Sequence, residues 1–374
     1  MTSPSTRCPE IDVFVHLSHG VDADKWRTGW KNGTLIGINE PTPYGYDRAT
    51  EMGCTVAYSI PTSERLAGRL TRLAVRSILG FDLVHAWRNR EGIRNADVVW
   101  THTETQGLAV LALLFFRHRP NRPATLLQNV WLVDRWPRYP PPNRWLFRRL
   151  LRTADVLTFH SERNRDTAAQ LLAPARCEVI KFGIRVDEKV EPFLRKRRGA
   201  LAVLTLGNDE HRDWVTAVRA IEQLREAHLT VLSRTFPSEL ARSADVTVRR
   251  VGNNSELVVL FAEADVVMIA LKPNEHASGL TVLQEAVLHG VPVVVTDAGG
   301  LTDYFDSSMV KYVPPHDPKA IADAIMQVVQ DPRSARDRAV LAQSRMTPDL
   351  ISSEAFVRRH VELSRELLEL HASG

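Results

Sequence analysis

Short apolar runs alternate with helix-sized stretches along almost the whole chain. Strands separated by helix-sized intervals are typical of parallel sheets with helices on both faces. The alternation occurs twice, so we predict an α/β protein with two such domains. The predicted strands are residues 12–17, 34–39, 55–59, 97–100, 124–128, 156–160 and 179–182, followed by 202–206, 229–233, 246–250, 266–271, 291–296 and 310–313.

A basic, polar junction at residues 195–199 interrupts the alternation. We therefore predict a first domain at 1–190 and a second at 191–349. A last amphipathic helix at 352–372 is expected to cross back, so that residues 350–374 complete the first domain. Ligands of open α/β sheets bind outside the carboxyl ends of the strands. Two domains facing each other would therefore share one cleft.

Cysteine usage and the N-terminal sequence bound the cellular setting. The chain of 374 residues has only three cysteines, widely spaced and without a CxxC pair. That argues against a disulfide framework or a cysteine zinc site and fits a reducing cytoplasm. The apolar run near the N-terminus is too short for an export signal, and no run approaches the roughly 18 residues that span a bilayer. We expect a cytoplasmic protein.

Positive charge is concentrated in the first half. Residues 1–185 carry 26 Lys and Arg against 17 Asp and Glu, whereas residues 186–374 carry 22 against 27. Two basic amphipathic stretches with apolar and aromatic neighbours have the composition of an interfacial membrane contact. A solvated helix face is the alternative, and no nucleic-acid-binding module is recognised. The residues predicted to touch an anionic membrane are Arg65, Arg69, Arg72, Arg76, Trp145 and Arg148.

The segment 274–300 has the organisation of a phosphate and ribose site. Ala277, Ser278 and Gly279 have small side chains, so a phosphate can approach the backbone there. Ser278 or Thr281 can cap the helix that follows, whose free N–H groups would face the ligand. Glu285 lies about one turn inside that helix, within reach of a hydroxylated group beside the phosphates.

These residues carry a resemblance to a known family. Residues 255–318 resemble the retaining GT-B glycosyltransferases of family four, which includes enzymes of bacterial cell-envelope polysaccharides. The order of helix, Gly-Val-Pro break and strand and the pair Glu285-Ala286 are the most specific points, and residues 97–102 and 154–161 match more loosely. The resemblance implies two Rossmann-like domains facing across a cleft and transfer from a nucleoside diphosphate sugar.

The chain departs from the family pattern in three features, the least informative being Phe182-Gly183 in place of an Asn-Gly turn before the interdomain linker. The family has two acids with seven residues between them, the first for the donor sugar and the second for the ribose. Glu285 fits the second place, but Ala277 occupies the first, and Glu275 or His276 reaches it only through a shifted turn. The family's phosphate clamp, an arginine and a lysine after the first strand of the second domain, is replaced here by Asn208 and Arg212.

The resemblance assigns roles to the polar groups at the strand ends. His102, Arg212 and Glu285 are predicted to be catalytic. We predict donor contacts from Gly207, Asn208, His276, Ser278, Gly279, Leu280 and Thr281. From their own polar and aromatic side chains, acceptor contacts are predicted for His16, His19, Glu40, Tyr44 and Tyr46, with plain loop polarity or a packed turn as the alternative. His16 and His19 lack a third metal ligand, and Asp22 and Asp24 imitate a metal-binding DxD motif in the wrong place.

The sequence therefore predicts a metal-independent hexosyltransferase that uses no cofactor. Its partners would be a nucleotide-sugar donor, a glycan or lipid-linked acceptor and an anionic membrane surface, without nucleic acid. It would work in the cytoplasm, at the inner face of the plasma membrane if the membrane contact holds. A sugar-nucleotide epimerase or hydrolase of the same fold, or a non-catalytic sugar-nucleotide-binding protein, remains an alternative. The absence of GxGxxG after the first strand disfavours a dehydrogenase.

Overall fold

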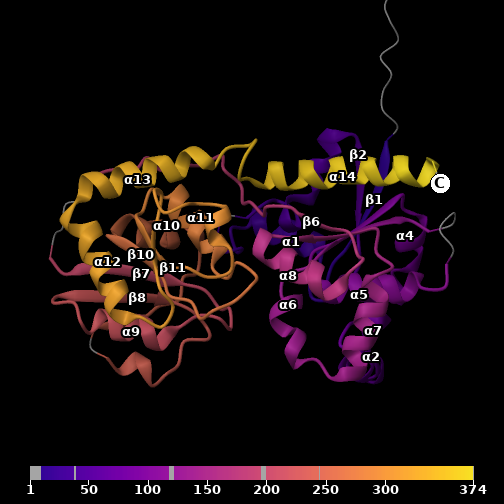
Figure 1. The fold of residues 1–374 in the computed structure, drawn as a ribbon, viewed down its shortest axis with the longest axis horizontal. Coiled ribbons are helices and arrows are strands. Elements are labelled where there is room, and N and C mark those ends of the chain that lie inside the picture. Colours follow the sequence, from indigo (N-terminus) through magenta and orange to yellow (C-terminus); the bar gives the residue numbers. More distant parts are fainter. Residues whose placement is uncertain (1–9, 38, 118–121, 195–198, 244, 374) are drawn as a thin grey trace, which may run out of the picture.

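Two α/β units lie side by side in the computed structural model (Figure 1), which describes residues 10–37, 39–117, 122–194, 199–243 and 245–373. Each unit contains a six-stranded sheet, with strand orders β2-β1-β3-β4-β5-β6 and β12-β11-β10-β7-β8-β9. All strand pairs are parallel. The predicted pair of parallel-sheet domains is confirmed.

The strands and helices follow the alternation seen in the sequence. The first sheet consists of β1 (Ile11–His16), β2 (Cys54–Tyr58), β3 (Val98–Thr101), β4 (Ala124–Gln128), β5 (Val156–Phe159) and β6 (Cys177–Val179). The second consists of β7 (Leu201–Leu206), β8 (Ala227–Leu232), β9 (Val246–Val248), β10 (Val266–Ile269), β11 (Val293–Thr296) and β12 (Lys311–Val313). The helices of the first half are α1 (Ala23–Lys31), η1 (Pro43–Met52), α2 (Leu66–Leu79), α3 (Leu83–Arg88), α4 (Arg90–Asn95), α5 (Glu104–Leu114), α6 (Leu132–Arg135), η3 (Trp136–Arg138), α7 (Pro141–Leu151) and α8 (Glu162–Leu172). Those of the second half are α9 (Trp214–Ile221), η4 (Leu240–Arg242), α10 (Asn254–Glu263), α11 (Leu280–Leu288), η5 (Leu301–Asp303), α12 (Pro318–Gln330), α13 (Pro332–Arg345) and α14 (Ser353–Ser373).

Two predicted strands differ from the structure. The described residues of 34–39 form a loop, and Ile38 lies outside the described part. Gly37 has a φ of 97°, and the Asn39 side-chain amide donates to the carbonyl oxygens of Ile36 and Gly37, so local turn bonds replace a sheet ladder. The strand expected at 179–182 ends at Val179, where its pairing with Phe159 ends.

The last helix, α14, returns to the first sheet (yellow in Figure 1). Phe356, Val357 and Val361 are buried in the same core cluster as Val13 and Trp100, so α14 covers one face of the β1–β3–β4 region. The predicted boundary at residue 190 stays a prediction, because junction residues 195–198 lie outside the described part. The prediction of a returning helix matches where α14 lies.

The chain passes between the two units twice, and the two passages touch. The Ser353 amide donates to the Ile184 carbonyl oxygen at 3.1 Å. A Cβ on Gly183 would stand 2.3 Å from the backbone carbon of Ser352, so only glycine permits this approach. The two chain passages between the units therefore lie against each other. No helix in the described ranges is long and apolar enough to cross a membrane.

Candidate functional site

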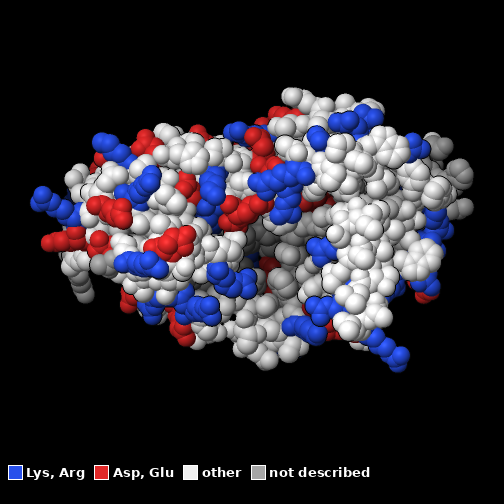
Figure 2. All heavy atoms as spheres, turned by 90° about the horizontal axis from the view of Figure 1, so that it is seen from below, with Lys and Arg blue, Asp and Glu red and all other residues white. Residues whose placement is uncertain are grey.

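A cleft of about 830 Å³ lies between the loop at 34–37 and the carboxyl ends of β7 and β8. Seen from below, the surface of the molecule is also hollowed between its two halves (Figure 2). The position agrees with the rule that α/β sheets bind ligands at the carboxyl ends of their strands. The cleft is lined by the predicted donor-site residues Gly207, Asn208, Thr281 and Glu285, and also by Ser233, Arg234, Arg249, Arg250, Val251 and Leu257.

Arg212 lies beside this cleft, between two glycines. Gly207 has a φ of 127°, and a Cβ there would lie 2.3 Å from Nη2 of Arg212. A Cβ on Gly279 would meet Ile269 at 2.8 Å and Nη1 of Arg212 at 3.3 Å. Glycine is thus required at both places to leave room for the guanidinium. The structure brings together three residues that are predicted to bind the donor phosphates.

The Arg212 guanidinium is buried without the partners that a buried charge needs. The residue is only 4% exposed, and Nε and Nη1 have no hydrogen-bond partner within the described ranges. Burial lowers the pKa of Arg212 to about 10, partly offset by the nearby carboxylate of Asp209. The group therefore stays cationic at neutral pH. An unpaired buried cation costs several kcal/mol, so this position is suited to an anion that supplies the missing bonds.

The N-terminus of α11 faces the same place. Gly279, in the left-handed conformation with φ 83°, is the residue before the helix, and no side chain caps it. The predicted capping role of Ser278 is wrong, because its hydroxyl donates to Asp209 Oδ1 at 2.9 Å. The predicted cap by Thr281 is also wrong, since Thr281 lies inside the helix. The Leu280 amide donates to the Ala277 carbonyl oxygen at 3.2 Å, but no side chain caps the amides that follow it, so this end of the nine-residue helix is suited to an anion. Leu280 is buried beside them.

Glu285 projects from α11 into the cleft toward the first unit. It is half-buried, and a Cβ on Gly37 would lie 2.6 Å from its Oε1. Asn208, the substitute for the family's arginine, accepts a hydrogen bond from the Arg234 amide at 2.7 Å. Asn208 therefore fixes the loop after β8 on the cleft wall. Both residues line the cleft, and their contact with a donor stays a prediction.

Glu275, the acid in the turn before α11, is paired with an arginine. Glu275 forms a two-bond ion pair with Arg163 of the first unit, with both N–O distances 2.9 Å. Ala277 is 4% exposed and has a φ of 54°. Neither residue offers a free carboxylate to a donor sugar. Within the described ranges, the structure thus has no acid at the place where the family has its first one.

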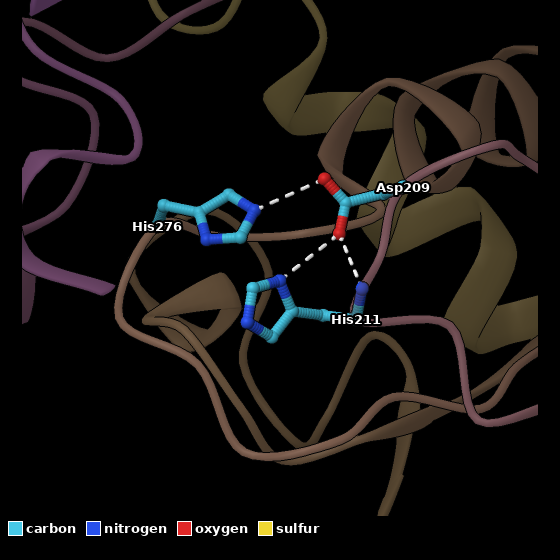
Figure 3. A group of neighbouring side chains, drawn as sticks. All are labelled: Asp209, His211 and His276. Carbon is cyan, nitrogen blue, oxygen red and sulfur yellow. Dashed lines mark hydrogen bonds and ion pairs between the residues drawn. The ribbon is translucent and has the colours of Figure 1, made fainter. Parts of the chain in front are cut away.

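His276 lies between two carboxylates from opposite units. Its Nδ1 is 2.6 Å from Asp134 Oδ2, and its Nε2 is 3.2 Å from Asp209 Oδ2. Figure 3 shows the imidazole of His276 pointing at Asp209, with His211 on the other carboxylate oxygen at 3.2 Å. Asp209, His211 and His276 each offer one atom that could bind a metal ion, and these three atoms lie within 4.8 Å of one another. No other group of this kind is found in the described ranges. Both ring nitrogens of His276 are hydrogen-bonded to carboxylates. Each nitrogen therefore needs a proton, and neither is free for a metal ion.

His102 is enclosed by the loop predicted to meet the acceptor. Tyr44 stacks on its imidazole with ring centroids 3.4 Å apart, and the Tyr46 hydroxyl lies 3.0 Å from its Nδ1. Burial, with His160 and His360 nearby, holds the pKa of His102 well below its usual value, so the ring is neutral.

Two of the predicted acceptor residues serve packing instead. Tyr46 has no exposed surface. Glu40 is 7% exposed and binds Arg48 and the hydroxyl of Ser353 on α14. Both hold η1 and its loop against α14, so an acceptor does not reach them in this conformation. Tyr44, half-buried at φ 56°, is the strained member of the group.

His16 and His19 meet a third histidine that the sequence did not single out. The His16 and His85 rings are stacked with centroids 5.0 Å apart, and His19 packs edge-on against His85 at 5.2 Å. Nδ1 of His16 and Nε2 of His85 are buried without a hydrogen-bond partner in the described part of the chain. Burial lowers the pKa of His16 to about 3 and that of His85 to about 4, so both are neutral.

The predicted membrane-contact residues separate into two groups. Arg72 is 7% exposed and pairs with Glu64 and Asp82, so its prediction as a surface contact is wrong. Arg148 is half-buried over the ring of Trp136. Four residues stay exposed, namely Arg65, Arg69, Arg76 and Trp145.

The apolar side chains of α2 point outward. Leu66, Leu70 and Leu73 are 73%, 58% and 40% exposed, whereas Arg72 lies on the inner side of the helix. Asn143 of α7 donates to the carbonyl oxygen of Ile78, so α2 and α7 lie side by side (Figure 1). The half of the molecule formed by the first unit shows mainly uncharged and basic surface in Figure 2.

Sequence reasoning missed the basic wall of the cleft and the partner of His276. Arg249 and Arg250 follow β9, so the strand-end rule could have found them. Asp134 carried no signal, because its contact is 142 residues away along the chain. Asp22, predicted to be no metal ligand, accepts hydrogen bonds from the amides of Asp24 and Lys25 and caps α1.

Part of the chain is similar in sequence to known proteins. Residues 198–331 match a family model described as Glycosyl transferases group 1. Glycogen synthase of Mycobacterium tuberculosis is 29% identical over 216 residues, which are 54% of this chain and 51% of that protein. The chain thus spans about half the length of the curated relatives it matches.

Solved structures resemble the chain over nearly its whole length. Sucrose-phosphate synthase from Thermosynechococcus elongatus has a TM-score of 0.73 at 18% identity, covering 96% of this chain and 100% of that one. Anabaena HepE in complex with UDP-glucose has a TM-score of 0.67 at 12% identity, with the same coverage. At such identities the likeness concerns the fold. The chain has the GT-B fold of glycosyltransferases, with two Rossmann-like domains facing across a cleft, and its second domain matches the group 1 transferases.

Proposed function

We propose that this chain is a glycosyltransferase that moves a sugar from a nucleoside diphosphate donor to a hydroxyl group. The observation that carries the proposal is the buried Arg212 guanidinium, whose unpartnered nitrogens lie between Gly207 and Gly279 beside the cleft. The family match of residues 198–331 supports it. The solved complex of HepE with UDP-glucose supports a nucleotide-sugar donor.

In this proposal the donor diphosphate is bound by Arg212 and by the N–H groups that follow Leu280 at the start of α11. As the bond between the sugar and the diphosphate breaks, negative charge grows on the leaving phosphate. A fixed cation and oriented N–H groups stabilise that charge without rearranging. Arg212 thereby supplies charge stabilisation that needs no metal, and Glu285 would bind the ribose. We further propose retention of the anomeric configuration, which rests on the family resemblance alone.

A donor panel tests the function directly. The protein is mixed with UDP-, GDP- and ADP-sugars, and its thermal unfolding and slow donor hydrolysis are followed. One nucleotide should raise the unfolding temperature, and its sugar should be released slowly and transferred once a hydroxyl acceptor is added. Release without transfer to any acceptor would favour the hydrolase alternative, and an isomerised sugar the epimerase. Binding without turnover would favour a non-catalytic role, and no stabilisation by any nucleotide would reject the proposal.

Replacing Glu285 by glutamine should weaken binding of that nucleotide about tenfold, which corresponds to one charged hydrogen bond of about 1.4 kcal/mol. The 2′,3′-dideoxy nucleotide should bind wild type and variant equally, because the lost partner is the ribose hydroxyl. Calorimetric titration of both ligands measures the difference. Glu263→Gln, an exposed acid on the neighbouring helix α10, is the control. Equal weakening of both nucleotides would assign Glu285 another role.

For the acceptor we propose a glycan or lipid-linked hydroxyl in cell-envelope or exopolysaccharide synthesis, handled in the cytoplasm. The first domain would bind it near His16, His19 and Tyr44. The outward apolar face of α2, flanked by Arg69 and Arg76, supports contact with an anionic membrane.

The membrane contact predicts salt-sensitive flotation with vesicles that contain phosphatidylglycerol. Replacing Leu66, Leu70 and Leu73 together by serine should lower the bound fraction at least tenfold, since each leucine contributes about 1 kcal/mol or more on burial. The unfolding temperature should stay within a degree or two of wild type, because these side chains are already exposed. A matched pair, Val340→Ser with Leu341→Ser, alters exposed apolar residues of α13 in the second domain. Absence of binding at low salt would reject the membrane contact.

A further inference from the structure

The two domains are joined by ion pairs that differ in burial. Arg138 and Glu210 meet at 2.8 Å with side chains 62% and 41% exposed, and Arg163 and Glu275 meet at 2.9 Å with 56% and 25% exposed. Exposed pairs of this kind contribute about 1 kcal/mol or less and are screened by salt. Only His276, with a side chain 3% exposed, makes a buried ion pair between the domains within the described ranges.

His276 connects a carboxylate of the first domain with a carboxylate of the second. Asp134, on α6 of the first domain, accepts from His276 Nδ1 and also accepts from the Glu275 amide at 2.9 Å. Asp209, after β7 of the second domain, accepts from His276 Nε2 and from the Ser278 hydroxyl. The Trp131 indole of the first domain also approaches Asp209 at 3.4 Å. The turn that precedes Gly279 is therefore held from both sides.

An imidazole with a carboxylate on each nitrogen requires two N–H donors, and hence a proton on both. We propose that His276 is a positioning residue, an imidazolium clasp that closes the first domain on the second and fixes the turn before α11 beside Arg212. This inference deepens the proposed function, because the diphosphate site is assembled only when the clasp is closed. His276 itself need not touch the donor phosphates.

Charges around the clasp set its pH dependence. Burial alone would lower the pKa of His276, but hydrogen bonds to Asp134 and Asp209 outweigh it and raise the pKa to about 9. The stabilisation is therefore complete below the usual histidine pKa of 6.5 and is lost as the pH rises through about 9. The titratable and charged groups near His276 are Asp134, Asp209, His211, His160 and Glu275, and Arg212 is a neighbour of the Asp209 carboxylate.

Small-angle scattering of the ligand-free protein tests the clasp apart from catalysis. At pH 7, His276→Gln should have a larger radius of gyration than wild type. Wild type should reach the same value only above about pH 9, and the radius of the variant should not change between these pH values. Asp134→Asn should have the same effect, and the double variant should be no more open than either single one. Glu210→Gln, which breaks an exposed pair, is the control and should matter only at low salt.

Activity and metal titration complete the test. With the donor found by the panel, His276→Gln should raise KM for the donor about tenfold with kcat within twofold, and should lose the alkaline limb of the kcat/KM profile. Unchanged scattering and KM would overturn the clasp while leaving the transferase proposal intact. Binding of Co²⁺ with a visible absorption band that His276→Gln and His211→Ala abolish would also overturn it, because the cluster would then hold a cation in place of the proton.

Discussion

Replacing Arg212 by methionine should abolish nucleoside diphosphate binding and leave the free protein at least as stable as wild type. The guanidinium is buried with two nitrogens that have no partner in the described part of the chain, so its removal relieves an uncompensated charge. With the diphosphate bound, the same nitrogens would make charged hydrogen bonds, and losing two of them costs about 3 kcal/mol or more than a hundredfold in affinity. Calorimetry and thermal unfolding without ligand measure the two effects.

Two companion variants sharpen this result. Arg212→Lys keeps the charge but loses the fork, and should bind about tenfold more weakly than wild type. Arg234→Met removes an exposed cleft arginine and should change affinity less than about fivefold. If Arg212→Met unfolded several degrees earlier and still bound the nucleotide, the residue would be structural and the proposed function would lose its main support.

Replacing Phe356 by alanine should destabilise the first domain by about 3–5 kcal/mol, the usual cost of emptying a buried aromatic site. Phe356 on α14 is fully buried and contacts Tyr46, Phe182 and His360. Urea unfolding followed by near-ultraviolet circular dichroism should show an earlier transition. Leu370→Ala on the same helix is 61% exposed in wild type and should shift the midpoint little.

The same experiment separates the domains. Because α14 contributes its apolar face to the first sheet, the second domain should keep its nucleotide-induced stabilisation in Phe356→Ala. A single transition that loses both domains together would mean that the second domain depends on the first for its stability.

The fold could be predicted from the sequence, because parallel sheets that are buried on both faces produce a clear alternation of apolar runs and helical stretches. The strand predicted at 34–39 was wrong, since an apolar run can equally line a cleft. The grouping of Gly207, Arg212 and Gly279 could be expected from topology, because all three follow strands of the second sheet. The carboxyl ends of parallel strands meet at one edge, so their polar loops converge there.

Other parts of the site could not be predicted because their causes are not local. Helical spacing put Arg72 on one face with Arg69 and Arg76, but only the folded position of Glu64 and Asp82 shows that this side chain turns inward. The pairing of Asp134 with His276 depends on how two domains dock. A count along the sequence located the missing acid at Ala277 yet could not show that Glu275 is engaged by Arg163.

The contact of Gly183 with Ser352 has a consequence for engineering. From β7 to α13 the second domain is one continuous stretch of chain, inserted into a first domain that is assembled from both sides of it. Its two joins lie next to each other, so a related donor domain could be grafted as a single cassette with both seams at one spot. A transplant of the first domain would instead need two separate segments, one of them α14.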